Sequence, residues 1–198
     1  MTRIGRDALT FERSYFDDIY RDDADPWAFE TSHYEQRKFA LTAALLPHPK
    51  YRRGVEAGCA NGALTRHLAP YCDQLHAFDF VAATVQRATE RLHHFPGVDV
   101  ALGEFPSHWP TDTGDLVVWS EVAYYLTAQG RRVAETGLDQ WLEPGGHLVA
   151  VHYTGTTNYP MHGRDVANWL DAVPHLQRKV TLTDQLFEAG VWERATRD

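Results

Sequence analysis

The stretch VEAGCANGALTRHL, residues 55–68, places a carboxylate and several small residues between an apolar run and a helical pattern. Glycine inside a regular element costs roughly 0.5–1 kcal/mol of backbone entropy, so this cluster indicates a tight turn that something approaches closely. A strand, a glycine turn and a helix in this order are typical of a ligand-binding crossover in doubly wound α/β folds. The spacing Glu56-x-Gly58-x-Ala60-x-Gly62 differs from the G-x-G-x-x-G of dinucleotide sites.

Short apolar runs alternate with helical patterns downstream of this stretch. The expected strands lie at 54–57, 75–80, 98–102, 115–120 and 147–153, and the expected helices at 63–69, 82–92, 127–141 and 164–172. Two alternating runs, 175–183 and 185–194, follow as a tight hairpin. This order predicts a Rossmann-like, doubly wound, seven-stranded α/β sheet, mostly parallel, with an antiparallel C-terminal hairpin.

Two helices are expected before the sheet. They cover residues 8–20 and 33–46, separated by the polar break RDDADP and ended by prolines. The inward side chains of the first helix are expected to be Leu9, Phe16 and Ile19. We therefore predict an N-terminal helical lid, residues 1–50, on a ligand-binding domain of residues 51–198.

Composition narrows the function classes. The 198 residues carry a formal charge of −8 and no run of five basic residues, which argues against a nucleic-acid partner. Two cysteines without metal or disulfide spacing fit a reducing compartment. The N-terminus lacks the apolar core of a signal peptide, and no apolar run is long enough to span a membrane. These features predict a cytoplasmic protein, a monomer or homodimer, with a small-molecule or oligosaccharide partner.

The acidic residue before the glycine turn restricts the ligand. Glu56 would repel a pyrophosphate, and no G-x-x-x-x-G-K-[ST] cradles a triphosphate. A cationic, phosphate-free nucleoside fits, and S-adenosylmethionine is such a ligand. Asp79, at the end of the second strand, could accept both ribose hydroxyl hydrogens while Phe80 faces the adenine. Glu104, after the third strand, could accept the adenine amino group while Phe105 packs on the ring.

Five stretches carry a resemblance to a known family. They are DPW (25–27), YEQRK (34–38), EAGCANGALTRHLAPYC (56–72), SEVAYYL (120–126) and LEPGGHLV (142–149). The chain resembles class I S-adenosylmethionine-dependent methyltransferases, above all the nodulation protein S family of rhizobial N-methyltransferases acting on de-N-acetylated chitooligosaccharides. It resembles more loosely the actinobacterial saccharide O-methyltransferases, including the 1-O-methyltransferase of methylmannose polysaccharide assembly. Residues and resemblance together assign the cofactor to Glu56, Gly58, Cys59, Ala60, Gly62, Asp79, Phe80, Glu104, Phe105 and Ser120.

The acceptor class depends on whether the site holds a general base. An amine needs only its neutral form, whereas a sugar hydroxyl gains typically 10²–10⁴-fold from a base. His152 ends the fifth strand, where the nodulation family has a small residue, and is either that base or a core histidine. Glu121 could orient the substrate or pair with His152, or it is a carboxylate that favours a helix N-terminus.

Aromatic and basic side chains complete the expected site. Lys38 or Arg37 could meet the methionine carboxylate, although either could instead belong to a solvated face. The candidate substrate contacts are Trp27, Tyr34, Tyr124, Tyr125, Tyr153, Tyr159 and His162; for Trp27 a hydrophobic plug, and for one of Tyr124 and Tyr125 plain core, is the alternative.

Three functions follow from these residues. The first is O-methylation of a saccharide hydroxyl, for example of a mannoside in polysaccharide biosynthesis, with His152 as the base. The alternative is N-methylation of an amino sugar, and the third is a non-catalytic module that binds the cofactor. No metal ligand spacing stands out, although Glu121, His152 and His162 could converge, so a divalent cation is neither predicted nor ruled out.

Overall fold

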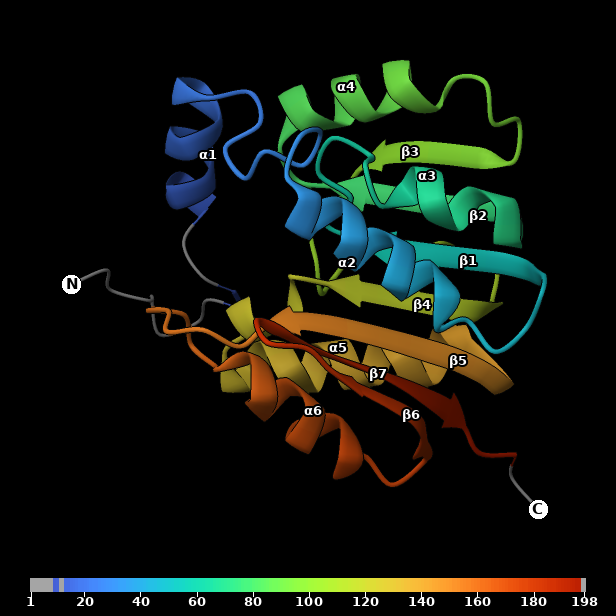
Figure 1. Ribbon diagram of the computed structural model, residues 1–198. Coiled ribbons are helices and arrows are strands. Elements are labelled where there is room, and N and C mark those ends of the chain that lie inside the picture. The colour runs from blue at the N-terminus through green and yellow to red at the C-terminus, as the bar shows by residue number, and fades with distance from the viewer. Residues whose placement is uncertain (1–8, 11–12, 197–198) are drawn as a thin grey trace.

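Seven strands are present in the computed structural model, which describes residues 9–10 and 13–196 (Figure 1). They are β1 (Tyr51–Ala57), β2 (Cys72–Asp79), β3 (Val98–Leu102), β4 (Gly114–Ser120), β5 (Leu142–Tyr153), β6 (Leu176–Thr183) and β7 (Phe187–Arg194). They form one sheet in the order β3-β2-β1-β4-β5-β7-β6. The first five strands are parallel, and β7 is antiparallel to both β5 and β6. The predicted sheet and its C-terminal hairpin are confirmed.

Helices cover both faces of this sheet. They are α1 (Arg13–Asp22), α2 (His33–Ala44), α3 (Thr65–Leu68), α4 (Ala82–Leu92), α5 (Ala128–Trp141) and α6 (Gly163–Asp171), with 3₁₀ turns η1 (Ala69–Tyr71) and η2 (Ala123–Tyr125). Side chains of α2 and α3 pack with Leu116 and Val118, whereas those of α5 and α6 pack with Val117 and Trp119. Burial on both faces explains why Leu116–Trp119 of β4 and Leu148–Val151 of β5 are continuously apolar.

The sheet order reverses direction between β1 and β4. In doubly wound folds the crevice at such a switch point, beside the carboxyl ends of the strands, is where ligands bind. α1 lies beside this end of the sheet (Figure 1). Its Phe16 ring contacts Phe80 after β2 at 5.4 Å and Tyr125 in η2 at 5.0 Å. The predicted separation into a lid and a binding domain stays a prediction, although α1 has the position that a lid requires.

The first predicted helix is shorter at its start than expected. α1 begins at Arg13, and Leu9 lies outside it, at a bend before Thr10, which forms an isolated antiparallel bridge with Leu126. Residues 8, 11 and 12 of the predicted helix lie outside the described residues. Leu9 is therefore not an inward residue of a helix; its carbonyl instead accepts a hydrogen bond from the backbone of Thr127.

The helix predicted after the glycine turn is also reduced. It forms one α-turn, Thr65–Leu68, followed by a 3₁₀ turn that contains Pro70. Proline has no backbone N–H to continue an α-helix, which accounts for the early end. Within the described residues, no helix combines the length and apolar character that a membrane span needs.

Candidate functional site

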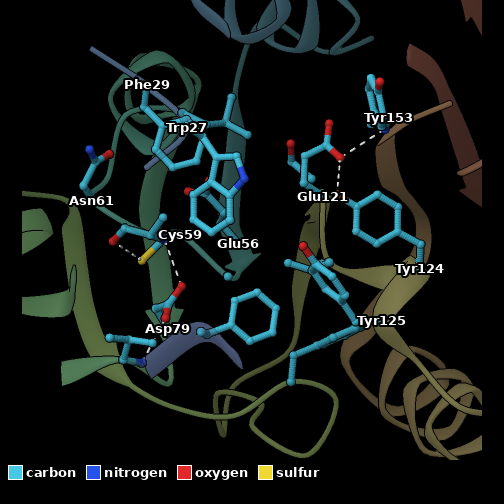
Figure 2. A pocket seen from close by; sticks show the side chains of 18 of the residues that line it. Trp27, Phe29, Glu56, Cys59, Asn61, Asp79, Glu121, Tyr124, Tyr125 and Tyr153 are labelled. Atoms are coloured by element: carbon cyan, nitrogen blue, oxygen red, sulfur yellow. Dashed lines mark hydrogen bonds between the residues drawn. The ribbon is translucent and has the colours of Figure 1, made fainter. Parts of the chain in front are cut away.

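A cavity of about 520 Å³ lies at the switch point (Figure 2). Residues at the carboxyl ends of β1, β2 and β4 form its floor, and α1, α2 and the loop 154–162 contribute the remaining walls. The volume is within the range of small-molecule sites. Most residues that the sequence assigned to a site line this cavity, so they share one location.

The turn after β1 explains the small residues of the opening stretch. Gly58, Ala60 and Gly62 have positive φ angles of 68°, 47° and 77°, a region that side chains disfavour. The backbone N–H groups of Gly58 and Cys59 donate to the carbonyl of Phe78, at 2.8 and 3.0 Å, which ties the turn to β2. A Cβ on Gly58 would lie 2.3 Å from a methyl group of Val122. The turn is thus fixed against the chain after β4.

Glu56 is a buried carboxylate at the base of the cavity. It is 2% exposed, and among the described residues its Oε2 atom has no hydrogen-bond partner. Burial raises the pKa of Glu56 to about 7, although the nearby Thr65 hydroxyl acts in the opposite direction. A buried unpaired charge is costly, so the carboxylate fits a ligand that brings a positive charge. A phosphate would be repelled at this position.

Asp79 at the end of β2 is oriented by the same turn. Its Oδ1 accepts the backbone N–H of Val81 at 2.9 Å and its Oδ2 that of Ala60 at 3.0 Å. Burial raises the pKa of Asp79 despite these hydrogen bonds. Each carboxylate oxygen keeps acceptor capacity, which suits a pair of ligand hydroxyl groups. Phe80, the next residue, presents its ring to the cavity.

The loop after β3 supplies a second polar group. Glu104 is exposed and lines the cavity beside Gly103. Phe105 also lines it, but this ring is 9% exposed and packs on Trp119 at 5.2 Å, so it belongs largely to the core. Ser120, the last residue of β4, lies at the cavity floor.

Aromatic rings from the N-terminal segment cover the cavity. Trp27 stacks on Phe29 with ring centroids 5.6 Å apart and contacts Tyr20 of α1 at 5.4 Å. Asp25 fixes this segment by accepting the backbone N–H of Phe29 at 2.9 Å. Figure 2 shows the Trp27 ring in the middle of the pocket that Glu56 and Cys59 also line. This position combines both interpretations of Trp27, because the ring is a plug and also a wall of the site.

Glu121 connects three parts of the site. Its Oε1 accepts a hydrogen bond from Lys38 of α2 at 2.7 Å. Its Oε2 accepts one from the Tyr124 hydroxyl at 2.6 Å and one from the backbone N–H of Tyr153 at 3.0 Å, both drawn in Figure 2. The backbone of Glu121 has a φ of 57°, a strained value for a residue with a side chain. The carboxylate is held by donors on both sides and links α2 to the ends of β4 and β5.

Lys38 lies between two carboxylates and not in front of an open anion site. Its Nζ atom is 3.1 and 3.0 Å from the two oxygens of Glu35, besides its bond to Glu121. Burial alone would lower the pKa of Lys38, but Glu121 and Glu35 raise it above its ordinary value. Burial likewise acts to raise the pKa of Glu121, yet Lys38 holds it below its ordinary value. The three charges sum to −1 in a part of the wall that faces the cavity.

Three tyrosines form the wall beside Glu121. The ring centroids of Tyr124, Tyr125 and Tyr159 lie 4.6 to 4.9 Å from one another, and all three line the cavity. Tyr34 and Tyr153 complete this aromatic end. The structure thus brings together the tyrosines that the sequence assigned to a substrate.

His152 does not line the cavity. It is 2% exposed, and its Nε2 accepts the backbone N–H of Ala123 at 3.1 Å. Burial lowers the pKa of His152 to about 4. The side chain of the next residue, Tyr153, points into the cavity, as alternation along a strand requires. The geometry therefore gives His152 the core role, and it holds the turn that carries Glu121.

Three other predicted residues also lie elsewhere. Arg37 forms an ion pair with Asp184 at 2.6 Å on the surface instead of meeting a ligand carboxylate. His162 caps α6, where its Nδ1 accepts the backbone N–H of Arg164 at 3.3 Å. Gly62 packs its backbone against Ala88 of α4 and permits a close approach. None of the three lines the cavity.

Sequence reasoning missed some residues of the wall. The most important is Glu35, which is 8% exposed and lines the cavity next to Lys38. Its signal was present, because Glu35 and Lys38 are three residues apart on one helical face. Others include Phe16, Tyr20, Asn61, Thr156, Thr157 and Asn158. Within the described part of the chain, no three His, Cys, Asp or Glu side chains gather as a metal ligand set, and Glu121, His152 and His162 do not converge on one.

Comparison with known proteins gives the family. The family model described as Nodulation protein S (NodS) matches residues 17–151, which is more than half of the chain. The chain belongs to the nodulation protein S family. The family match runs from within α1 to within β5.

Two curated family members are similar over 127 residues, 63% of this chain. Nodulation protein S of Rhizobium tropici is 32% identical and that of Sinorhizobium fredii is also 32% identical. The chain spans only 53% and 59% of the length of these relatives.

Solved structures show the same fold. A candidate methyltransferase from Pseudomonas syringae is 34% identical, with a TM-score of 0.73 over 82% of this chain and 100% of that one. The N-methyltransferase NodS from Bradyrhizobium japonicum WM9, crystallised with S-adenosyl-L-homocysteine, is 24% identical. Its TM-score is 0.73 over 91% of this chain and 97% of that one. This second likeness shows the fold alone.

Proposed function

We propose that this chain is an S-adenosylmethionine-dependent methyltransferase. The observation that carries the proposal is the buried carboxylate of Glu56, whose Oε2 has no hydrogen-bond partner among the described residues. It stands at the base of a cavity that also presents Asp79 and Glu104. Three acidic groups around one nucleoside-sized space suit a cationic nucleoside and oppose a phosphorylated one. The complex of a family member with S-adenosyl-L-homocysteine supports this assignment.

Different residues of this chain would contact different parts of the cofactor. Glu56 would face the cationic part of the cofactor, Asp79 would accept the ribose hydroxyl hydrogens, and Glu104 would reach the adenine amino group. Trp27 and Phe80 would exclude water from the cofactor. When bound, S-adenosylmethionine supplies a methyl carbon that its sulfonium has already activated, so the protein mainly has to align the acceptor.

We further propose an amine as the acceptor, carried by a sugar. The wall formed by Glu35, Lys38 and Glu121 has a net charge of −1, which attracts an ammonium group to the cavity. The neighbouring tyrosines offer rings on which sugar C–H faces stack. The amine must lose a proton before it attacks the methyl carbon, and we assign Glu35 as the acceptor of that proton, because it lines the cavity at the aromatic end and burial raises its pKa. The similarity to the N-methyltransferase NodS from Bradyrhizobium japonicum WM9 supports this acceptor class.

A sugar hydroxyl, the first of the acceptors that the sequence suggested, has less support. A hydroxyl needs a base more than an amine does, and the imidazole of His152 faces the backbone of Ala123. This reading would require another residue as the base.

A methyl-transfer assay with two acceptor sets tests both proposals. With labelled S-adenosylmethionine, we expect transfer to oligosaccharides that carry a free amine and none to mannosides or fully N-acetylated chains. The rate should rise with pH as the amine loses its proton. Transfer to hydroxyl groups alone would contradict the amine but not the methyltransferase. Absence of S-adenosylmethionine binding in calorimetry would contradict the methyltransferase itself.

His152→Gln distinguishes the two roles of this histidine. The Gln side-chain oxygen can still accept the Ala123 N–H, so we expect kcat to stay within about tenfold of the parent value, with an unchanged pH profile. A lost base would instead cost about 10²–10⁴-fold in kcat. His152→Ala should mainly destabilise the fold, because a buried N–H without a partner costs about 1–3 kcal/mol. A hundredfold loss of kcat in the Gln variant, with normal cofactor binding, would show that His152 is the general base.

A further inference from the structure

Two histidines meet at the β2–β3 end of the sheet, outside the cavity. His76 of β2 and His108 of the loop after β3 have their Nε2 atoms 3.0 Å apart, with ring centroids at 5.2 Å. The Nδ1 atom of His76 lies 2.8 Å from a carboxylate oxygen of Asp99 in β3. The His76 side chain is 19% exposed and that of Asp99 76% exposed, so ions in solution can reach the pair.

Asp99 determines which nitrogen of His76 is free. The carboxylate accepts a hydrogen bond from Nδ1–H, and the lone pair of the neutral ring is then on Nε2, which points at His108. A neutral imidazole with its second nitrogen bonded to a carboxylate is the usual form of a metal-bound histidine.

The separation of the two nitrogens matches that of two ligands on one ion. With metal–nitrogen bonds of about 2.0–2.1 Å, two nitrogens lie roughly 3.0 Å apart at a right angle and about 3.4 Å apart in a tetrahedral site. We propose that His76 and His108 bind one divalent first-row transition-metal ion, with Asp99 fixing His76 and water filling the other positions. On binding, the proton on Nε2 of His108 moves to its Nδ1, so both rings stay neutral. The described residues offer no third ligand, which predicts a chelate of moderate affinity.

Neighbouring residues hold the His108 ring in place. His108 packs on Gly103, where an added Cβ would lie 2.5 Å from its ring, and on Phe78 with centroids 4.7 Å apart. Gly103 and Phe78 also line the cavity, so the chelate would stiffen one cavity wall. Metal binding itself requires neither the cofactor nor the acceptor, and its test is independent of the proposed methyl transfer.

Titration of the full chain with ZnCl2, after removal of any histidine tag, tests the site. We expect one ion per chain by calorimetry, no binding by His76→Gln or His108→Gln at the same concentrations, and about 10–100-fold weaker binding by Asp99→Asn. His94→Gln is the matched control, because His93 and His94 are also neighbouring rings, at 5.4 Å, and it should bind like the parent.

A second measurement needs no variant. With one equivalent of CuCl2, the electron paramagnetic resonance spectrum of the parent chain should show coupling to two imidazole nitrogens. Absence of any zinc or copper binding would overturn the proposal. So would unchanged binding in both histidine variants.

Discussion

Lys38→Met should lower the free energy of unfolding at pH 7 by about 3–5 kcal/mol, the usual cost of removing one partner from a buried ion pair. Lys38 has 3% of its side chain exposed and is bonded to both Glu35 and Glu121, so its loss leaves two carboxylates without a counter-charge. Methionine keeps most of the volume, which limits the packing change. Denaturant unfolding, followed by fluorescence at several pH values, measures the effect.

The pH dependence of this loss follows from Glu121. Lys38 holds the pKa of Glu121 below its ordinary value, so the ion pair stabilises the native state above the unfolded pKa, and this contribution is lost as the pH falls through the lower folded pKa. The difference between parent and variant should therefore be full at pH 7 and shrink below about pH 4.5.

Arg37→Met is the matched control for Lys38→Met. The two residues are adjacent on α2, but Arg37 pairs with Asp184 on the surface, where solvent screens the charges. We expect no measurable change in stability from this variant. An Arg37 effect as large as that of Lys38, or an Lys38 effect independent of pH, would contradict the role given to the buried cluster.

The part of the cavity lining that depends on local sequence was predictable. The turn from Glu56 to Gly62 and the strand ends at Asp79 and Ser120 belong to one repeated pattern, in which each parallel strand delivers its last residues to the same edge. The distant partner of Lys38 was not predictable, because Glu121 lies 83 residues away and meets it only when α2 packs over the sheet. A lysine on an apolar helical stripe predicts a buried partner but does not identify which residue that partner is.

The sequence also did not predict which face of the sheet each strand residue occupies. In a sheet covered by helices on both faces, apolar residues occupy both sets of alternate positions, so hydropathy does not say which set faces the site. His152 and Tyr153 occupy opposite sets, and the sequence offered no reason to prefer one. Only the pairing of β5 with β4 and β7 fixes that the His152 ring faces Ala123 and that Tyr153 faces the cavity.

Glu56→Gln should stabilise the protein without ligand and weaken its cofactor binding. Burial raises the folded pKa of Glu56 to about 7, so its contribution is favourable below the unfolded pKa near 4.5 and is lost as the pH rises through 7. Gln cannot ionise, and the variant should gain up to about 3 kcal/mol of unfolding free energy over the parent at pH 8 and little at pH 5. Thermal unfolding of both proteins across this range measures the gain.

The same substitution removes the charge that meets the cationic ligand. We expect the affinity for S-adenosylmethionine and S-adenosylhomocysteine, which share the ammonium group, to fall by about ten- to a hundredfold, since a charge-assisted hydrogen bond contributes about 1.5–3 kcal/mol. In the parent, binding should weaken about tenfold per pH unit below 7 and release one proton, whereas the variant should show neither effect. Calorimetry in buffers of different ionisation enthalpy counts that proton.

Glu104→Gln, at the exposed side of the cavity, is the control variant. Its binding of S-adenosylmethionine should still release one proton. A Glu56 variant that binds as tightly as the parent would refute the cationic-nucleoside site, because no other buried carboxylate in the described cavity wall combines a pKa near 7 with an unpartnered oxygen.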